Sequence, residues 1–310
     1  MPRGPRLDAP GVLHHVMVRG IERRPIFRDD ADRADFVRRL AALAAAGALR
    51  VYAWALLPNH LHLLVRTDRR PLARSMRSLL TGYAGAFNRR HHRAGHLFQN
   101  RYKSIVVEAE PYGLELVRYL HLNPLRAGLV RDLRALERYP WSGHAVLLGR
   151  SPAPWQVTAE VLGRFGRPLR SARARYRAFV AAGAGQGRRP ELQGGGLVRS
   201  AGGWAAVRAL RRGREAYRGD ERVLGSSAFV ATLLREVDQR HPREAGPDRR
   251  LTVDTVIERV CRAVGVRRAL LPEGGRRRPV VEARGGIAYL WVEHLGRSGR
   301  QLAPVLGVRP

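Results

Sequence analysis

The chain has 310 residues, and its 57 Lys+Arg against 26 Asp+Glu give a formal net charge of +31. Hydrophobic residues make up 45% of the chain, an ordinary share for a globular protein, which argues against disorder throughout. The length suggests about two domains. The single cysteine, Cys261, excludes an intramolecular disulfide framework and is typical of a reducing cytosol. No apolar run reaches the ~18 residues of a membrane span, and no signal segment follows the N-terminus.

The basic residues are spread along the whole chain rather than gathered in a tail. Nearly all of them are arginine, and the only lysine is Lys103. Codon bias in a GC-rich genome accounts for that ratio, but it does not account for the shortage of acidic residues. Because a strongly basic domain is a candidate for binding nucleic acid, the charge is the first indication of function. Arginine also suits bidentate phosphate contact and stacking on bases.

The first half of the chain predicts alternating strands and helices. In chain order these are a strand over 11–21, a helix over 30–46, strands over 49–57 and 60–66, a helix over 71–92, a strand over 96–108 and a helix over 110–123. The last helix is expected to finish near Asn123 because Pro124 disfavours helical backbone at the residue before it. This order is typical of a split βαβ sheet with helices on one face.

The second half of the chain predicts helices separated by loops and linkers, without strands. It predicts an Arg-rich helix over 160–182, a Gly-rich loop over 183–203, a helix over 220–237, a linker over 242–250, helices over 253–264 and 279–295, and the start of a third over 301–306. Glycine and proline clusters punctuate these elements. No role is assigned to the basic region 151–250.

Two histidines stand two residues apart in the strand predicted over 60–66. Residues i and i+2 of a strand face the same way, so His60 and His62 can converge on one metal ion while Leu61 points into the core. Taken alone, such a pair is also compatible with an ordinary surface or core position. Since residue 64 is leucine, the His-x-His-x-His and His-x-His-x-Asp motifs are excluded.

The helix over 110–123 carries a second group of polar residues. Tyr119 and Asn123 are four residues apart, on one helix face, whereas His121 lies off that face. A phenol there can attack a substrate while the amide oxygen of Asn123 supplies a third metal ligand. A buried tyrosine at a polar helix end is the alternative explanation.

Three segments together resemble a known family. They are PNHLHLL over 58–64, GHLFQNRYKS over 95–104 and YLHLNPLRAG over 119–128. In this order they are similar to the single-tyrosine HUH transposases, and most of all to the REP-associated tyrosine transposases of the insertion-sequence-200-like group. The resemblance covers roughly residues 8–150.

The resemblance implies an α+β, ferredoxin-like domain with an antiparallel sheet. It also implies a Mg²⁺- or Mn²⁺-dependent nuclease and strand transferase that acts on single-stranded or hairpin DNA through a 5′-phosphotyrosine intermediate. By motif position, His60 and His62 match the metal ligands, Tyr119 the nucleophile and Asn123 the third ligand. A cytoplasmic, nucleoid-associated monomer or homodimer without membrane contact is expected.

Basic side chains near these motifs are candidates for gripping the DNA strand by phosphate contact and stacking. In the first half they are Arg89, Arg90, Arg93, Arg101 and Lys103. A solvated helix end is the alternative for the first three.

The C-terminal segment shows a second resemblance. VIERVCRAVG over 256–265, Arg276, Arg277 and Arg278, and GRQLAPVLG over 299–307 are similar to the DNA-binding domain of the bacterial replication initiator (DnaA-type). That domain has a helix-turn-helix, which implies a mainly helical region 251–310 that contacts duplex DNA through the three arginines. The chain stops at Pro310, where the recognition helix would begin, so we expect either that this helix is lost or that the sequence is truncated. A helical domain of another purpose is the alternative explanation.

Two rival functions stay open. One is a domesticated DNA-binding regulator that keeps the fold without cutting. The other is an unrelated metallohydrolase that uses His60 and His62 on a small molecule, although such an enzyme needs neither Tyr119 nor the charge of +31.

Overall fold

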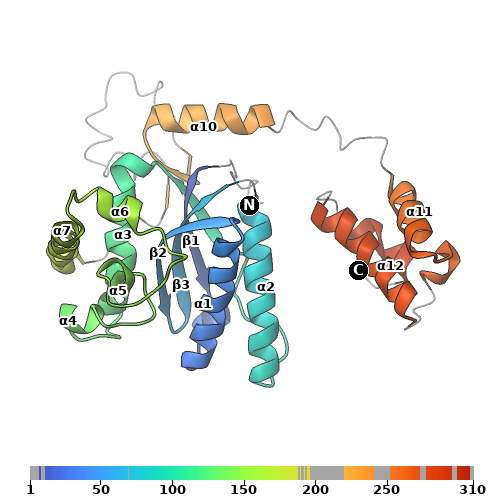
Figure 1. Ribbon diagram of the computed structural model, residues 1–310, viewed down its shortest axis with the longest axis horizontal. Coiled ribbons are helices and arrows are strands. Elements are labelled where there is room, and N and C mark those ends of the chain that lie inside the picture. The colour runs from blue at the N-terminus through green and yellow to red at the C-terminus, as the bar shows by residue number, and fades with distance from the viewer. Residues whose placement is uncertain are drawn as a thin grey trace. The chain divides into compact units, whose positions relative to one another are not determined.

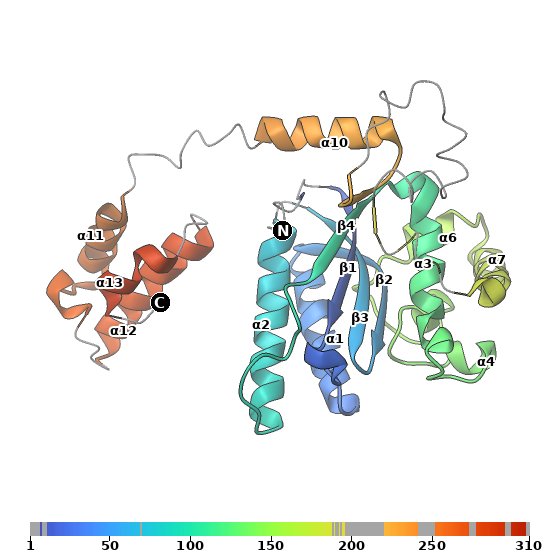
Figure 2. The ribbon, with the colours of Figure 1, turned by 180° about the vertical axis from the view of Figure 1, so that it is seen from behind.

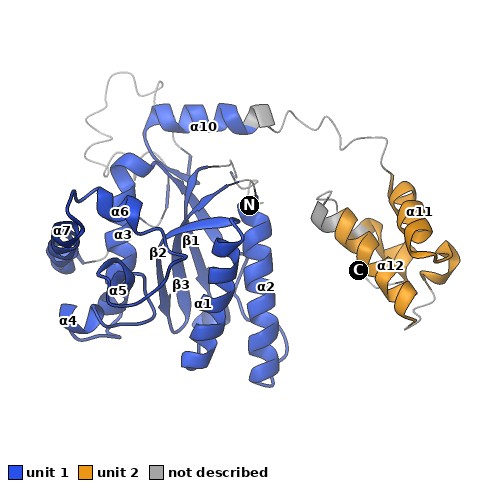
Figure 3. Ribbon diagram, in the orientation of Figure 1, with its two compact units in different colours: residues 1–240 blue, residues 241–310 orange. Residues whose placement is uncertain are grey.

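The chain divides into two compact units, residues 1–240 and 241–310 (Figure 3). The computed structural model describes residues 7, 11–68, 70–187, 189, 192, 194–195, 220–240, 252–272, 277–294 and 299–307. The predicted linker 242–250 and most of the predicted loop 183–203 lie outside the described residues.

The first unit is built on a five-stranded sheet. Its strands are β1 (Leu13–Arg19), β2 (Leu49–Leu57), β3 (His60–Thr67), β4 (Lys103–Val107) and β5 (Val223–Leu224). The order across the sheet is β2-β3-β1-β4-β5, with β5 parallel to β4 and every other pair antiparallel. β1 and β2 therefore run the same way with β3 between them, which is the expected split βαβ arrangement.

Helices cover both faces of this sheet (Figure 1). Helices α1 (Asp30–Ala45) and α2 (Leu72–Arg90) lie against one face, and α3 (Ala109–Arg126) lies against the other. Figure 2 shows the same three layers from behind. The prediction of helices on one face is wrong, because the strands carry apolar side chains on both sides and each side needs cover.

The alternation along the strands divides the core in two. Leu61, Leu63 and Val65 of β3 pack with α1 and α2, whereas Leu64 packs with α3. The helix α1 begins where the sequence indicates, since the side chain of Asp29 accepts a hydrogen bond from the backbone N–H of Asp32. The strand expected over 96–108 is shorter and begins only at Lys103.

Helix α3 continues past its internal proline to Arg126, so the predicted end near Asn123 is too early. Every residue from Leu116 to Pro124 is buried, because the helix packs on β2 and β3 on one side and on α7 on the other. The carbonyl of Pro124 still accepts a hydrogen bond from the N–H of Leu129 (2.9 Å). Tertiary packing here outweighs the local preference at the residue before proline.

Short helices complete the first unit on the α3 side. They are α4 (Leu133–Leu136), α5 (His144–Leu147), α6 (Ala159–Gly163) and α7 (Leu169–Ala182). The single helix expected over 160–182 is therefore two, and the chain passes through Pro168 between them. Val161 of α6 and Tyr176 of α7 lie in the same core cluster as Tyr119 of α3. Helix α10 (Ser227–Arg240) follows β5 and packs its Val230 near Val106 of β4.

The second unit is helical over its described residues. It contains α11 (Val253–Val264), α12 (Arg278–Ala288), a π-helical turn (Tyr289–His294) and α13 (Ala303–Leu306) around a small core of its own. The helix-turn-helix and the likeness to the replication-initiator domain stay predictions. Among the described residues of the whole chain, no helix is long and apolar enough to cross a membrane.

Candidate active site

The two histidines of the HxH motif open strand β3. His60 pairs with Leu57 of β2, and His62 pairs with Met17 of β1, so both imidazoles lie on the sheet face that α3 covers. Their ring centroids are 5.3 Å apart. Leu61 between them is fully buried in the opposite core, as the alternation of a strand requires.

Helix α3 brings Tyr119 to these histidines. The centroid of the Tyr119 ring lies 6.0 Å from that of His62, with the rings perpendicular. His121 faces the other way, where its Nδ1 lies 2.8 Å from the Tyr176 hydroxyl, and this agrees with its predicted place off the Tyr119 face. Asn123 is 8% exposed, and its buried Nδ2 has no hydrogen-bond partner among the described residues.

One cavity of about 720 Å³ joins these groups. His60, His62, Tyr119 and Asn123 all line it. Its wall also carries basic side chains from four parts of the chain: Arg19, Arg23, Arg101, Lys103 and Arg126. A hollow with a phenol, two imidazoles, an amide and a positive wall suits a polyanionic substrate with a phosphodiester at its centre.

The imidazoles of this site are held in a neutral form. Burial, and secondarily the charge of Arg19, lowers the pKa of His60 to about 4. Burial is also the largest cause that lowers the pKa of His62 well below its ordinary value. Neutral imidazoles are the form that binds a metal ion.

Each histidine has one ring nitrogen engaged by a neighbour. His60 Nδ1 lies 2.7 Å from Oδ1 of Asn59. His62 Nδ1 lies 3.0 Å from Nε2 of His15, a fully buried residue of β1 whose ring plane is inclined by 27° to that of His62. The second nitrogen, Nε2, has no such contact in either residue among the described parts of the chain.

These residues fit a divalent cation. Two imidazole nitrogens and an amide oxygen are donors that Mn²⁺ accepts, and an amide oxygen also suits Mg²⁺. The buried Nδ2 of Asn123, which has no hydrogen-bond partner among the described residues, is consistent with this, because a half-turn of the amide would put the oxygen in its place. No group of three or more His, Cys, Asp or Glu side chains is gathered for a metal within the described residues, so the set depends on Asn123.

The predicted DNA-contacting residues of the first unit fall into two groups. Arg101 and Lys103 lie on the cavity wall. Arg89 and Arg90 end α2, Arg93 follows three residues after its last residue, and none of them lines this cavity.

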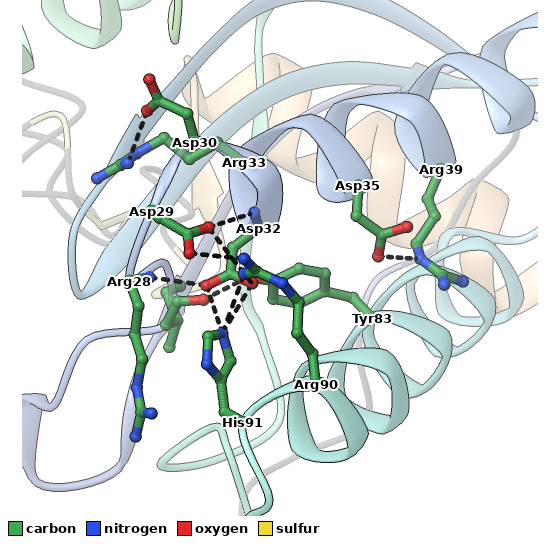
Figure 4. Close-up of polar contacts among 11 residues, drawn as sticks. Arg28, Asp29, Asp30, Asp32, Arg33, Asp35, Arg39, Tyr83, Arg90 and His91 are labelled. Carbon is green, nitrogen blue, oxygen red and sulfur yellow. Dashed lines mark hydrogen bonds and ion pairs between the residues drawn. The ribbon is translucent and has the colours of Figure 1, made fainter.

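Arg90 is engaged in a carboxylate cluster (Figure 4). It forms ion pairs with Asp29 (2.7 Å) and with the buried Asp32 (2.5 Å). His91 lies 2.8 Å from the same Asp32 carboxylate. These pairs tie α2 to the start of α1, so much of the charge of Arg90 is balanced within the protein.

The arginines predicted to contact DNA in the second unit are only partly described. Arg277 and Arg278 are exposed at the start of α12, and Arg276 lies outside the described residues. Their role in binding DNA stays a prediction.

Four residues of the site were not singled out from the sequence: His15, Arg19, Arg23 and Arg126. Arg126 stands seven residues after Tyr119, two helical turns on, and its guanidinium carbon lies 5.4 Å from the centre of the Tyr119 ring. A helix prediction that continued past Pro124 would have found it. His15 needed the pairing of β1 with β3, which the sequence does not give.

Comparison with known proteins agrees with the motifs. Residues 10–123 match the family model described as "Transposase IS200 like". The resemblance of this segment to the insertion-sequence-200-like transposases is thereby confirmed, and the segment contains His60, His62, Tyr119 and Asn123. No curated protein matches the chain.

Among solved structures, one match is the "Structure of the REP associates tyrosine transposase bound to a REP hairpin". It has 16% sequence identity and a TM-score of 0.41, and the alignment covers 52% of this chain and 93% of that one.

Proposed function

We propose that this protein is a DNA transposase that cuts single-stranded or hairpin DNA and transfers the strand, with Tyr119 as nucleophile and His60, His62 and Asn123 as ligands of Mg²⁺ or Mn²⁺. The observation that carries the proposal is one basic cavity lined by all four residues. The match of residues 10–123 to the IS200-like transposase family supports it.

The reaction breaks one phosphodiester bond and forms another. The Tyr119 phenol oxygen bonds to phosphorus, the bond from phosphorus to the 3′ oxygen breaks, and the DNA is left with a free 3′-hydroxyl and a 5′-phosphotyrosine. The phenol proton goes to solvent, and the leaving 3′ oxygen takes up a proton. Because the ester is conserved, the reverse step rejoins strands without ATP.

Different residues of the chain have different roles in this reaction. A divalent cation at the histidines would polarise the phosphoryl oxygens and stabilise the charge that develops on them. Packing in the core holds the Tyr119 ring, and Arg126 lies beside that ring. The positive side chains of Arg101 and Lys103 bind the flanking phosphates.

The test is a denaturing gel of the full chain with end-labelled single-stranded hairpin DNA and Mn²⁺. The DNA is taken from repeats beside the protein's own gene. A covalent protein–DNA band is expected for the wild type and is expected to be lost in Tyr119→Phe and in the His60→Ala/His62→Ala double variant. Tyr112→Phe is the matched control, because Tyr112 lies on the same helix but does not line the cavity.

A band that persists in Tyr119→Phe would contradict the assignment of the nucleophile. The assay is repeated with Mg²⁺. If no covalent band forms with Mn²⁺ or with Mg²⁺, while a native gel shows bound and uncut DNA, the protein is instead a DNA-binding regulator of the same fold.

A further inference from the structure

His15 is a buried histidine that connects a backbone carbonyl to His62 of the candidate metal site through two hydrogen bonds. Its Nδ1 lies 3.1 Å from the backbone carbonyl of Leu192, and its Nε2 lies 3.0 Å from Nδ1 of His62. The side chain of His15 has no exposed surface. It does not line the cavity, so it would touch neither the metal ion nor the DNA.

The carbonyl of Leu192 fixes where the protons lie. A carbonyl oxygen only accepts, so the Nδ1 of His15 carries a proton and donates it. The ring of His15 is fully buried and contacts a carbonyl oxygen and another imidazole, so it is neutral and its Nε2 is left as an acceptor. The hydrogen bond between the two rings must then be donated by Nδ1–H of His62.

His60 is held by a similar pair of hydrogen bonds, through Asn59. The Nδ2 of Asn59 donates to the backbone carbonyl of Arg23 (3.0 Å), which turns Oδ1 of Asn59 toward His60. The Nδ1–H of His60 donates to that oxygen (2.7 Å). In both cases a backbone carbonyl determines the proton on Nδ1, and the lone pair is left on Nε2.

We propose that His15 is a positioning residue, which places the proton of His62 on Nδ1 and so keeps Nε2 of His62 available for the divalent cation. Asn59 does the same for His60. Partners behind a metal-binding imidazole orient the ring and select its tautomer. The Leu192 carbonyl also couples the site to a segment far along the chain. This inference rests on the proposed function in taking His60 and His62 as ligands.

The first experiment reads the tautomer directly, without metal or DNA. Long-range ¹H–¹⁵N spectra of the histidine-labelled full chain distinguish a proton on Nδ1 from one on Nε2. For the wild type, His62 is expected to carry its proton on Nδ1. A proton found on Nε2 of His62 in the wild type would overturn the proposal, and this reading needs no variant to fold.

Three variants then separate positioning from packing. His15→Leu removes both hydrogen bonds, and the Nδ1 form of His62 is expected to be lost. His15→Gln offers an amide oxygen to His62 and an N–H to Leu192, and it is expected to retain that form. His14→Leu is the matched control, because His14 is an equally buried neighbour on β1 that contacts Ser104 instead.

The second readout is Mn²⁺ affinity of the full chain, measured by titration without DNA. His15→Leu is expected to bind Mn²⁺ about 10- to 100-fold more weakly, whereas His15→Gln and His14→Leu stay near the wild type. Unchanged affinity in His15→Leu would overturn the proposal.

Failure of the proposed function would give a different result from failure of this inference. It would appear as the absence of a covalent DNA adduct from wild-type protein that still shows the expected tautomer and binds Mn²⁺.

Discussion

Acid should destabilise the first unit steeply, because its buried histidines are held neutral. Burial lowers the pKa of His14, His15 and His144 from 6.5 to about 4. Each has a neutral partner in the fold; for His144 it is the Tyr176 hydroxyl, 2.7 Å from Nδ1. In the unfolded chain the same imidazoles titrate near their ordinary pKa of about 6.5.

The sign of the effect follows from this difference in pKa. The folded-state pKa lies below the unfolded one, so the unfolded chain binds protons first as the pH falls. The stabilisation is therefore fully present above pH ~6.5 and is lost progressively toward pH ~4. The free energy of unfolding falls by about 1.4 kcal/mol per pH unit for each such histidine in this range.

The expected loss is large compared with the stability of a typical protein. Between pH 7.5 and pH 5, each of the three histidines removes about 2 kcal/mol, or about 6 kcal/mol together. Natural proteins have about 5–15 kcal/mol in total. The first unit should therefore approach its unfolding midpoint near pH 5 without added denaturant.

The assay is urea unfolding in the presence of a chelator at several pH values, followed by tryptophan fluorescence. Trp54 in the core of the first unit and the partly buried Trp155 pack against each other with tilted rings, whose centroids are 5.6 Å apart, and both report on this unit. His144→Gln is the matched variant, because it removes one titrating group and should lower the pH slope by about 1.4 kcal/mol per pH unit. Equal unfolding free energies at pH 5 and pH 7.5 would refute the reasoning.

Three further predictions concern two positions that stabilise the first unit, Asp32 and Gly20, and the binding of DNA. Asp32→Asn should lower the free energy of unfolding by about 1–3 kcal/mol in urea at neutral pH, because the buried carboxylate accepts hydrogen bonds from the backbone N–H of Arg28 and from the half-exposed Arg90; an unchanged free energy of unfolding would contradict this. Gly20→Ala should lower the melting temperature and the yield of covalent DNA adduct, since a Cβ there would lie 2.1 Å from the backbone oxygen of Arg24; wild-type values of both would count against the close approach. Raising the salt from about 50 to 200 mM should weaken hairpin DNA binding at least tenfold in a filter assay, and a flat response would exclude phosphate-driven binding.

The sequence was most informative where local rules decide the outcome. Strand alternation placed His60 and His62 on one face and Leu61 on the other, and helical spacing placed Tyr119 apart from His121. These are rules of covalent geometry and period, and they hold in any fold that contains a strand and a helix there. The motif order also identified the family that residues 10–123 match.

The sequence was least informative where burial overrides local preference. Pro124 predicts a helix end, yet packing on both sides carries α3 on to Arg126 and so brings a guanidinium beside Tyr119. Likewise, the strands carry apolar side chains on both faces, but this pattern does not show which helix covers which face. α1, α2 and α3 occupy both faces because each buries apolar area there.

The sequence by itself determined which chemical groups the site could contain: two imidazoles on one strand face, a phenol and an amide on one helix face, and a strongly basic chain around them. Only the tertiary structure decided which residues form hydrogen bonds to the two imidazoles. The contact of His15 with His62 depends on the register of β1 against β3, and its contact with Leu192 joins residues 177 apart in the chain. Such pairings are set by the packing of the whole unit, and no local spacing rule contains them.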